Sequence, residues 1–148
     1  MARLWVYDLR VADPQSVEEW LQKARAHAVS AKLLSDDKVA AGEALFHVGL
    51  GTECALKALI MRRHGLNGWP TRDLRPDLYT HSLRDLLVLA DVQLSARDPR
   101  AASWKVVLDW DRNQGYDPKP MPRKVAKAWV EAAFGEKGAV TWIRMTLA

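Results

Sequence analysis

Residues 45–59 have the sequence LFHVGLGTECALKAL, which is the longest amphipathic signal in the chain. Five of these residues recur at the spacing of one face of an α-helix: Leu45, Val48, Thr52, Leu56 and Leu59. Apolar residues at intervals of three and four positions are typical of a helix that packs against others. We therefore predict that this stretch is the central helix of a helical bundle.

The flanking residues predict where the central helix begins and ends. Asp36 and Asp37 are residue types that cap helices or occupy their first turn. The basic residues 62–64 precede Gly65, as is typical of a helix end, where cations suit the negative end of the helix dipole. Within the helix, Glu53 and Lys57 stand one turn apart, which predicts an ion pair on its exposed face.

A first helix should precede the central one. It is predicted to open at Asp13-Pro14, because aspartate caps helices and proline suits the first helical position. The short turn at residues 35–37 predicts that the two helices are antiparallel neighbours. The inward stripe is rich in alanine and would allow a close approach: Val17, Trp20, Leu21, Ala24, Ala28, Ala31 and Leu34.

Three further helical segments follow the central helix. A third helix should start after Thr80 and a fourth should run from about Arg100 to Asn113. A last helix should follow the extended connector 119–122 and be kinked or split by glycines at 135 and 138. No alternating strand pattern is present. We predict an all-α, up-and-down bundle of four to five helices with a broken last helix, forming one domain over residues 1–148 with an N-terminal arm at 1–13.

Composition bounds the protein class. The chain has 148 residues, of which 49% are hydrophobic, so it should fold as a globular domain. Cys54 is the only cysteine and should be a buried, inert thiol. The absence of a secretory signal or a ~20-residue apolar run predicts a cytoplasmic protein without membrane contact. The net charge of +4 permits, but does not require, a polyanionic partner.

Several kinds of site are not indicated. The chain has no phosphate-binding glycine loop and no pair of zinc-binding cysteines. No two of the four histidines stand four residues apart on one predicted helix, so we expect no metal and no cofactor. Gly49 and Gly51 lie inside a helical pattern and are better interpreted as positions of close helix packing than as a phosphate loop.

Four segments in order resemble HEPN domains, a family of helical nucleotide-binding domains of higher eukaryotes and prokaryotes. Residues 53–60, ECALKALI, resemble the E-x-A-L-K-A-L helix of that family. Residues 81–86, HSLRDL, resemble its next helix start. Residues 110–118, WDRNQGYDP, resemble its aromatic-Arg-Pro segment, and Trp20-Leu21 fits its first helix. The resemblance covers roughly Pro14 to the C-terminus.

The resemblance implies a helical homodimer, here cytoplasmic and prokaryotic. Many HEPN domains are metal-independent ribonucleases, often the toxin of a toxin–antitoxin pair or a defence against phage. Others bind nucleotides or RNA, or serve as partners of a minimal nucleotidyltransferase. In the ribonucleases, an arginine and a later histidine from two protomers share one cleft. An antitoxin or a nucleotidyltransferase is thus an expected kind of partner.

The chain keeps only the first half of that catalytic pattern. Arg112-Asn113 matches it, but no histidine lies beyond His81. An arginine can stabilise charge on a phosphorane but does not exchange protons near neutral pH. Tyr116 could supply a proton, although a phenol normally titrates near ~10. The candidate catalytic residues are therefore Arg112, Asn113 and Tyr116, and the sequence favours binding over cleavage.

Each candidate also has a structural interpretation. Arg112 could pair with a carboxylate at 109, 111 or 117 rather than with a phosphate, and Asn113 could cap the fourth helix. His81 should be satisfied by the local backbone at the start of the third helix. A basic stretch could be a solvated face or a phosphate-binding edge beside Arg112: Lys119, Arg123, Lys124 and Lys127.

The tryptophans have similar alternatives. Trp104, Trp110, Trp129 and Trp142 occupy core-like positions, although tryptophans can also stack on bases. Trp69 lies in a Gly-Pro loop, where we expect it to be exposed as an interface or ligand contact.

Three functions follow, in order of preference. The first is a HEPN-like domain that acts by binding, as a dimer and with RNA, a nucleotide or a partner protein. The second is a HEPN ribonuclease that uses Arg112 with an unusual acid–base group. The third is a scaffold bundle without a role on nucleic acid.

Overall fold

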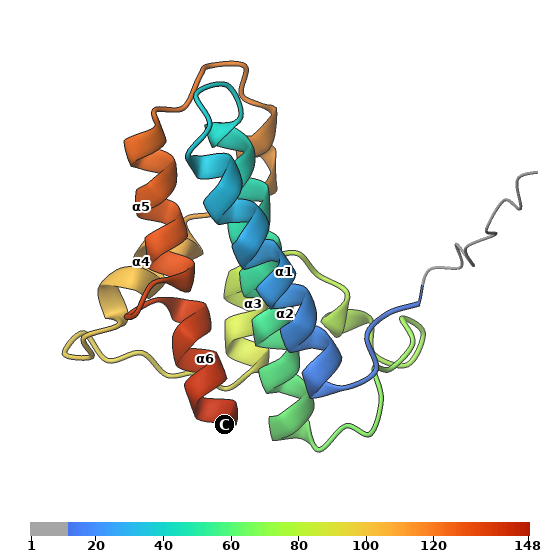
Figure 1. Ribbon diagram of the computed structural model, residues 1–148. Coiled ribbons are helices and arrows are strands. Elements are labelled where there is room, and N and C mark those ends of the chain that lie inside the picture. The colour runs from blue at the N-terminus through green and yellow to red at the C-terminus, as the bar shows by residue number, and fades with distance from the viewer. Residues whose placement is uncertain (1–11) are drawn as a thin grey trace, which may run out of the picture.

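The computed structural model describes residues 12–148 and shows an all-α bundle (Figure 1). Most of the predicted arm at 1–13 lies outside the described residues. No strand is found between residues 12 and 148. The helices are α1 (Val17–Ser35), η1 (Ala41–Glu43), α2 (Ala44–His64), η2 (Pro76–Leu78), α3 (Leu83–Leu89), α4 (Ala101–Leu108), η3 (Arg112–Tyr116), α5 (Arg123–Phe134) and α6 (Ala139–Leu147), where η denotes a 3-10 helix.

The antiparallel pair of α1 and α2 is the largest contact in the bundle, as predicted. Ala24 and Ala31 on α1 are completely buried, which lets the two backbones approach closely. The helix begins later than the predicted Asp13-Pro14. Its N-cap is Ser16, whose hydroxyl accepts a hydrogen bond from the backbone N–H of Glu19 at 3.1 Å.

The start of α2 was also predicted too early. The Asp37 carboxylate accepts hydrogen bonds from the backbone N–H groups of Val39 and Ala40, both at 2.8 Å, and so closes a turn. The 3-10 helix η1 follows, and α2 begins at Ala44. The end is as predicted: Gly65 adopts the left-handed conformation, with φ +63°, that terminates many helices.

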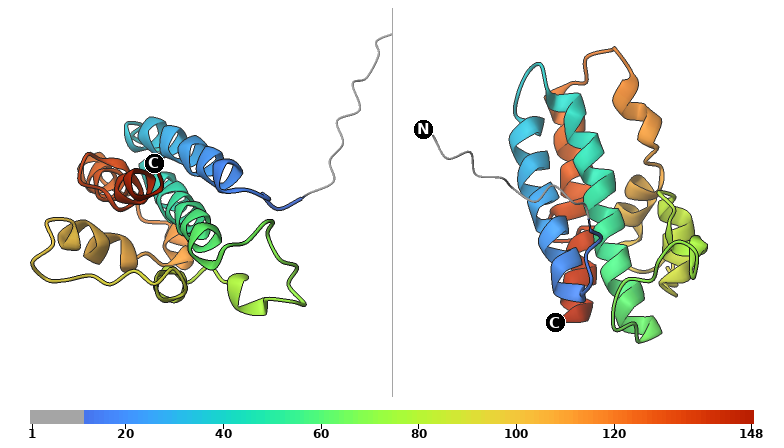
Figure 2. Two further views of the ribbon diagram at one scale, coloured as in Figure 1. Left: turned by 90° about the horizontal axis from the view of Figure 1, so that it is seen from below. Right: turned by 90° about the vertical axis from the view of Figure 1, so that its right-hand side faces the viewer.

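Helix α2 lies at the centre of the molecule, with α1 on one side and α3 and α4 on the other (Figure 2). Fifteen of its 21 residues are buried. By length and composition, residues 41–64 are apolar enough to cross a membrane, but 83% of the most apolar window is buried inside the bundle. Its apolar character is accounted for by this central position.

Helices α3 and α4 are short and lead into a separate turn. Ser82 caps α3 by accepting from the backbone N–H of Asp85, close to the predicted start. Helix α4 ends at Leu108 rather than Asn113. Asp111 then begins η3 with a capping box, in which its carboxylate accepts from the Asn113 N–H and its own backbone N–H donates to the side-chain oxygen of Gln114.

The predicted broken last helix is confirmed. Helix α5 ends at Phe134 and α6 starts at Ala139. A Cβ atom on Gly138 would lie 2.5 Å from the carbonyl oxygen of Ala133, so the chain can turn this tightly only with glycine. The hydroxyl of Thr141 donates to the Gly135 carbonyl at 2.6 Å and fixes the angle between the two helices.

Candidate functional site

The predicted site around Arg112 lies in η3, on the surface. The side chain of Arg112 is exposed and makes no ion pair within residues 12–148. Its expected carboxylate partners are occupied elsewhere: Asp109 pairs with Arg84 at 3.1 Å, while Asp111 and Asp117 accept from nearby backbone N–H groups. The pairing of Arg112 with one of these carboxylates, one of its two sequence interpretations, is therefore not found, and its side chain is exposed.

The other two predicted catalytic residues share this turn. Asn113 is exposed in η3 and does not cap α4. The ring of Tyr116 is 72% exposed and meets the ring of Phe46 edge-on, with centroids 5.8 Å apart. Gly115 lies so close to Phe46 that a Cβ atom would overlap the ring. The turn is therefore held against α2 while its polar side chains face solvent.

Trp110 anchors the start of the turn. Its indole Nε1–H donates to the carbonyl oxygen of Leu45 at 2.8 Å, and its ring covers Gly49 of α2. A Cβ atom at Gly49 would lie 1.9 Å from that ring, which confirms the predicted close packing at this glycine. Trp104 and Trp110 are buried, and Trp129 and Trp142 pack against the core, as predicted.

The four predicted basic residues do not form one edge. Lys127 pairs with the Asp36 carboxylate at 2.8 Å, and Arg123 donates to the Asp36 carbonyl oxygen at 3.3 Å. These two cations join α5 to the turn between α1 and α2. Lys119 and Lys124 are exposed and make no ion pair within the described part of the chain.

The α1–α2 turn and the connector that precedes α5 lie at one end of the bundle (Figure 1). A groove of about 730 Å³ is lined by residues of both segments. Its apolar lining includes Val39, which is 94% exposed, and Val125, which is 42% exposed. Its charged lining has both signs: Lys38, Glu43, Asp117 and Lys119. We call this feature the end groove.

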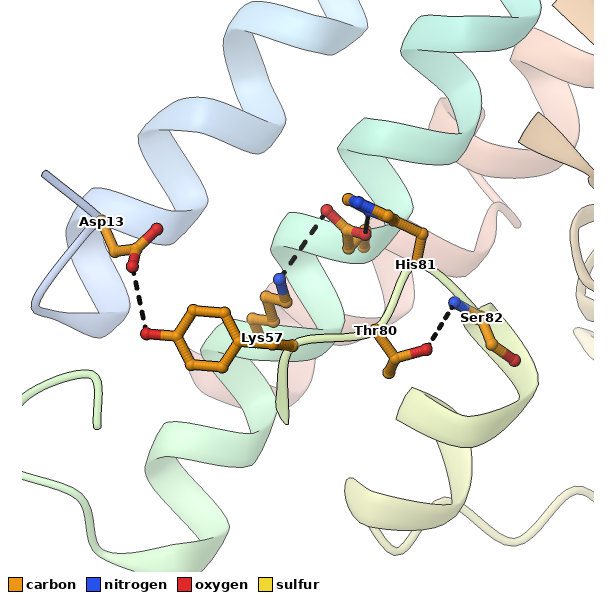
Figure 3. Close-up of polar contacts among 7 residues, drawn as sticks. Asp13, Lys57, Thr80, His81 and Ser82 are labelled. Carbon is orange, nitrogen blue, oxygen red and sulfur yellow. Dashed lines mark hydrogen bonds and ion pairs between the residues drawn. The ribbon is translucent and has the colours of Figure 1, made fainter. Parts of the chain in front are cut away.

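A second polar site lies in the middle of α2, where the sequence predicted an exposed ion pair. Glu53 and Lys57 are only 6% and 7% exposed, so the predicted exposure is wrong although the ion pair is present. The Glu53 carboxylate lies 3.8 Å from the Lys57 ammonium and accepts a hydrogen bond from His81 Nδ1 at 2.6 Å. Figure 3 shows His81 reaching from the loop before α3 across to α2.

Two tryptophans enclose the Lys57 ammonium. Its nitrogen lies 5.1 Å from the ring centre of Trp20 and 5.6 Å from that of Trp69, within the range of cation–π attraction. The two rings meet edge-on at 5.0 Å. Trp69 is only 6% exposed, so the predicted exposed loop contact is wrong. The ring packs over the Lys57 ammonium and adds to the stabilisation that Glu53 gives this buried charge.

His81 is held as an oriented imidazole, not by local backbone as predicted. Its Nδ1 is bound to Glu53, and its side chain is 54% exposed. A carboxylate that holds one ring nitrogen fixes the tautomer and leaves Nε2 for proton transfer. Sequence reasoning quoted Glu53 and His81 as separate motif residues. It could not pair them, because 28 residues separate them.

The Arg112 turn and His81 contact the same face of α2. Phe46 and Gly49 contact the turn, and Glu53 holds His81. Positions 46, 49 and 53 follow each other at intervals of three and four residues, so they lie along one helix face. Seven residues of α-helix rise about 10 Å, which sets the scale of the axial separation between the two contacts.

A third polar contact joins His27 of α1 to His47 of α2. Their Nδ1 atoms are 3.0 Å apart and both rings are half-buried. Burial and then the neighbouring His47 lower the pKa of His27 from 6.5 to about 4. Burial also lowers the pKa of His47, although Glu43 opposes this. Sequence reasoning missed the pair because it compared histidines only within single helices.

The Cys54 thiol and the remaining metal-ligating side chains form no further candidate site within residues 12–148. Burial raises the pKa of the Cys54 thiol to about 12, so the thiol is protonated at neutral pH, as predicted for an inert cysteine. Between residues 12 and 148, no three side chains of His, Cys, Asp or Glu gather as a metal-binding group. Comparisons with protein-family models, curated proteins and solved structures find no match.

Proposed function

We propose that the protein is a HEPN-like helical domain that acts by binding, as a homodimer whose two copies meet across the end groove. The observation that carries this proposal is the exposed apolar lining of the groove. Val39 is 94% exposed on a turn that is otherwise hydrogen-bonded and ordered. Apolar side chains displayed this openly beside a concave surface are typical of protein contacts.

The charges around the groove favour a second copy of the same chain as the partner. In a two-fold interface, each surface patch meets itself, so the patch must be complementary to itself. The end groove has two cations, Lys38 and Lys119, and two anions, Glu43 and Asp117. Such a mixed lining can pair opposite charges across a two-fold axis, whereas a lining of one sign would repel its copy.

Exposed cations border the same end of the bundle and suit a phosphate-bearing ligand, RNA or a nucleotide. Lys119 lines the groove itself, and Arg112 lies in η3, the turn that supplies Gln114 and Gly115 to the groove lining. Neither cation has an ion-pair partner within residues 12–148. A dimer across the groove would bring two sets of these cations together. Their number would set the salt dependence of RNA binding.

Sedimentation velocity over a range of protein concentrations tests the dimer. Val39→Glu should weaken self-association at least about tenfold, because the carboxylate would be buried against apolar groups. Val88→Glu is a matched control, since Val88 is 77% exposed on α3, away from the groove. A protein that stays monomeric at all concentrations, or a dimer that Val39→Glu leaves intact, would contradict the proposal.

The phosphate ligand is tested separately with fluorescent single-stranded RNA in the presence of EDTA. Arg112→Ala and Lys119→Ala should each weaken binding and reduce its salt dependence. Arg97→Ala removes an exposed arginine that does not line the end groove, and it should change neither the RNA affinity nor its salt dependence. A dimer that binds no RNA and no nucleotide would leave only the scaffold role.

A second candidate, a metal-independent ribonuclease, is favoured by the common face of α2. Arg112 could stabilise a phosphorane, and His81, oriented by Glu53, could transfer protons. Metal-free cleavage of RNA that leaves a 2′,3′-cyclic phosphate, and that is lost in both Arg112→Ala and His81→Ala, would support this candidate. Cleavage retained in either variant would contradict it.

A further inference from the structure

We propose that His27 and His47 form a binding site for a transition-metal dication between α1 and α2. Neither histidine lines the end groove, so the proposal requires neither the dimer nor the RNA ligand. It rests on a pair of imidazole nitrogens, one from each of the two longest helices, that lie 3.0 Å apart. No other side chain of residues 12–148 is hydrogen-bonded to these two nitrogens.

The separation of the two rings suits two ligands of one ion. Imidazole nitrogens bind zinc at about 2.0–2.1 Å, so a tetrahedral ion places two of them about 3.3–3.4 Å apart and their ring centres about 5.2 Å apart. The ring centres of His27 and His47 are 5.2 Å apart. The rings would therefore keep their separation, and the two nitrogens would tip apart by a few tenths of an ångström.

Metal binding would change the tautomer of one ring. A ligating imidazole must be neutral and must turn a ring nitrogen that carries no proton toward the ion. Without a metal, one of the two Nδ1 atoms must carry a proton to form the hydrogen bond. In the complex both would face the ion as acceptors, and Nε2 would carry the proton of each ring.

The two histidines do not complete the coordination of an ion by themselves. Both residues are half-buried, so an ion could reach them from solvent. Glu43 stands four residues before His47, about one helical turn away, and also lines the end groove. Water would complete the coordination. Two imidazoles select borderline ions such as Cu²⁺, Ni²⁺ and Zn²⁺ over Mg²⁺ and Ca²⁺, which prefer oxygen ligands.

The experiment titrates the full chain, free of any histidine tag, with each metal salt alone by calorimetry. We expect binding in the order Cu²⁺ above Ni²⁺ and none for Mg²⁺. Loss of residues that merely orient a ligand costs about 10–100-fold in metal affinity, so His27→Gln and His47→Gln should each cost at least about tenfold. His64→Gln removes a histidine that bonds the Leu89 carbonyl oxygen instead, and should leave the affinity unchanged.

Nitrogen NMR of the histidine rings gives a readout that does not depend on how the variants fold. Zn²⁺ should shift the Nδ1 resonances of two of the four histidines in the unmodified chain and remove their hydrogen bond. Absence of Zn²⁺, Ni²⁺ and Cu²⁺ binding would overturn the proposal. So would binding that survives in both folded variants, or shifts confined to His64 and His81.

Discussion

Glu53 and Lys57 are two charged side chains in the middle of a helix whose other buried residues are mostly apolar. Taking charges out of water is costly, and the pair is tolerated because each charge has further partners. Glu53 also binds His81, and Lys57 lies between the rings of Trp20 and Trp69. The cluster therefore fastens the loop at 65–82 to the central helix from two directions.

Replacing one member of this pair should be costly, and the two replacements should differ. Glu53→Gln would leave the Lys57 ammonium buried without an anion and should cost about 3–5 kcal/mol of unfolding free energy. Lys57→Met would leave Glu53 with His81 and keep contacts to both tryptophans, so it should cost less than about 2 kcal/mol. Urea unfolding measures both values. Equal losses of unfolding free energy would show that His81 does not stabilise the Glu53 carboxylate when Lys57 is removed.

The histidine pair makes a pH prediction. Because the pKa of His27 is about 4 in the folded protein and 6.5 in the unfolded chain, the unfolded chain binds more protons between these values. Stability should therefore fall as the pH falls from about 6.5 toward 4. The ring is half exposed, so we expect roughly 1 kcal/mol rather than the full linkage value.

Chemical denaturation in EDTA at pH 7, 6, 5 and 4 measures this loss. The double variant His27→Gln/His47→Gln should flatten the curve in that window. It should still lose stability below about pH 4, because Asp36 and Asp77 have lowered pKa values from their ion pairs with Lys127 and Arg75. If the variant shows the same pH dependence of unfolding free energy, then groups other than the two histidines cause the loss of stability.

At the scale of elements, the turn η3 is placed by α2 rather than by its own sequence. The Trp110 ring covers Gly49, and the Phe46 ring covers Gly115. Each contact pairs an aromatic ring with a glycine on the opposite element, so that neither can move inward. This interlock fixes the exposed position of Arg112 at one end of the bundle.

Gly49→Ala tests the interlock. The new Cβ atom would lie 1.9 Å from the Trp110 ring, which must move, so we expect a net loss of about 1–3 kcal/mol even though alanine favours helix. Gly42→Ala is the matched control, because its Cβ atom would lie at an ordinary 3.5 Å from Met121. Urea unfolding compares the two. A Gly49→Ala protein as stable as the control would show that η3 is loosely held.

The helices that the sequence predicted well have either a long periodic series of apolar residues or a glycine that marks where the helix ends. The stripe of α2 and the left-handed Gly65 are such features, and so are the glycines between α5 and α6. The starts at Asp13 and Asp36 were wrong, because aspartate caps turns as readily as helices. Asp37 closes a turn, and the cap of α1 is Ser16.

The candidate site was less predictable because its pairs span different elements. Arg112 was found by its motif, and its exposure could not be read from nearby carboxylates, since Asp109 binds Arg84 on another helix. The exposed face assigned to Glu53 and Lys57 followed from their spacing alone. Their burial depends on Trp69, which only the folded loop brings over them. Such contacts depend on which face of a helix meets another element. The spacing of residues within one helix does not contain this information.

At the scale of the whole molecule, the loop at 65–82 is held by buried contacts, whereas the end of the bundle with the end groove is held in part by surface contacts. Near the Glu53 cluster, the loops are fastened by buried contacts. At the other end, the polar contacts between the α1–α2 turn and α5 are those of Asp36 with Arg123 and Lys127, which lie at the surface. Surface ion pairs contribute little, so a second copy of the chain would further stabilise this end.

Hydrogen exchange at two protein concentrations tests this picture. In a dilute monomer, amides of residues 38–40 and 117–121 should exchange fast, while the buried centre of α2 should exchange slowest, close to the rate set by global unfolding. At concentrations that form the dimer, only the two end segments should gain protection. Val39→Glu should keep them unprotected at every concentration, and Val88→Glu should behave like the unmodified protein. If the dimer forms while these segments stay unprotected, then the end groove is not the interface, and the exposed Val39 requires another partner.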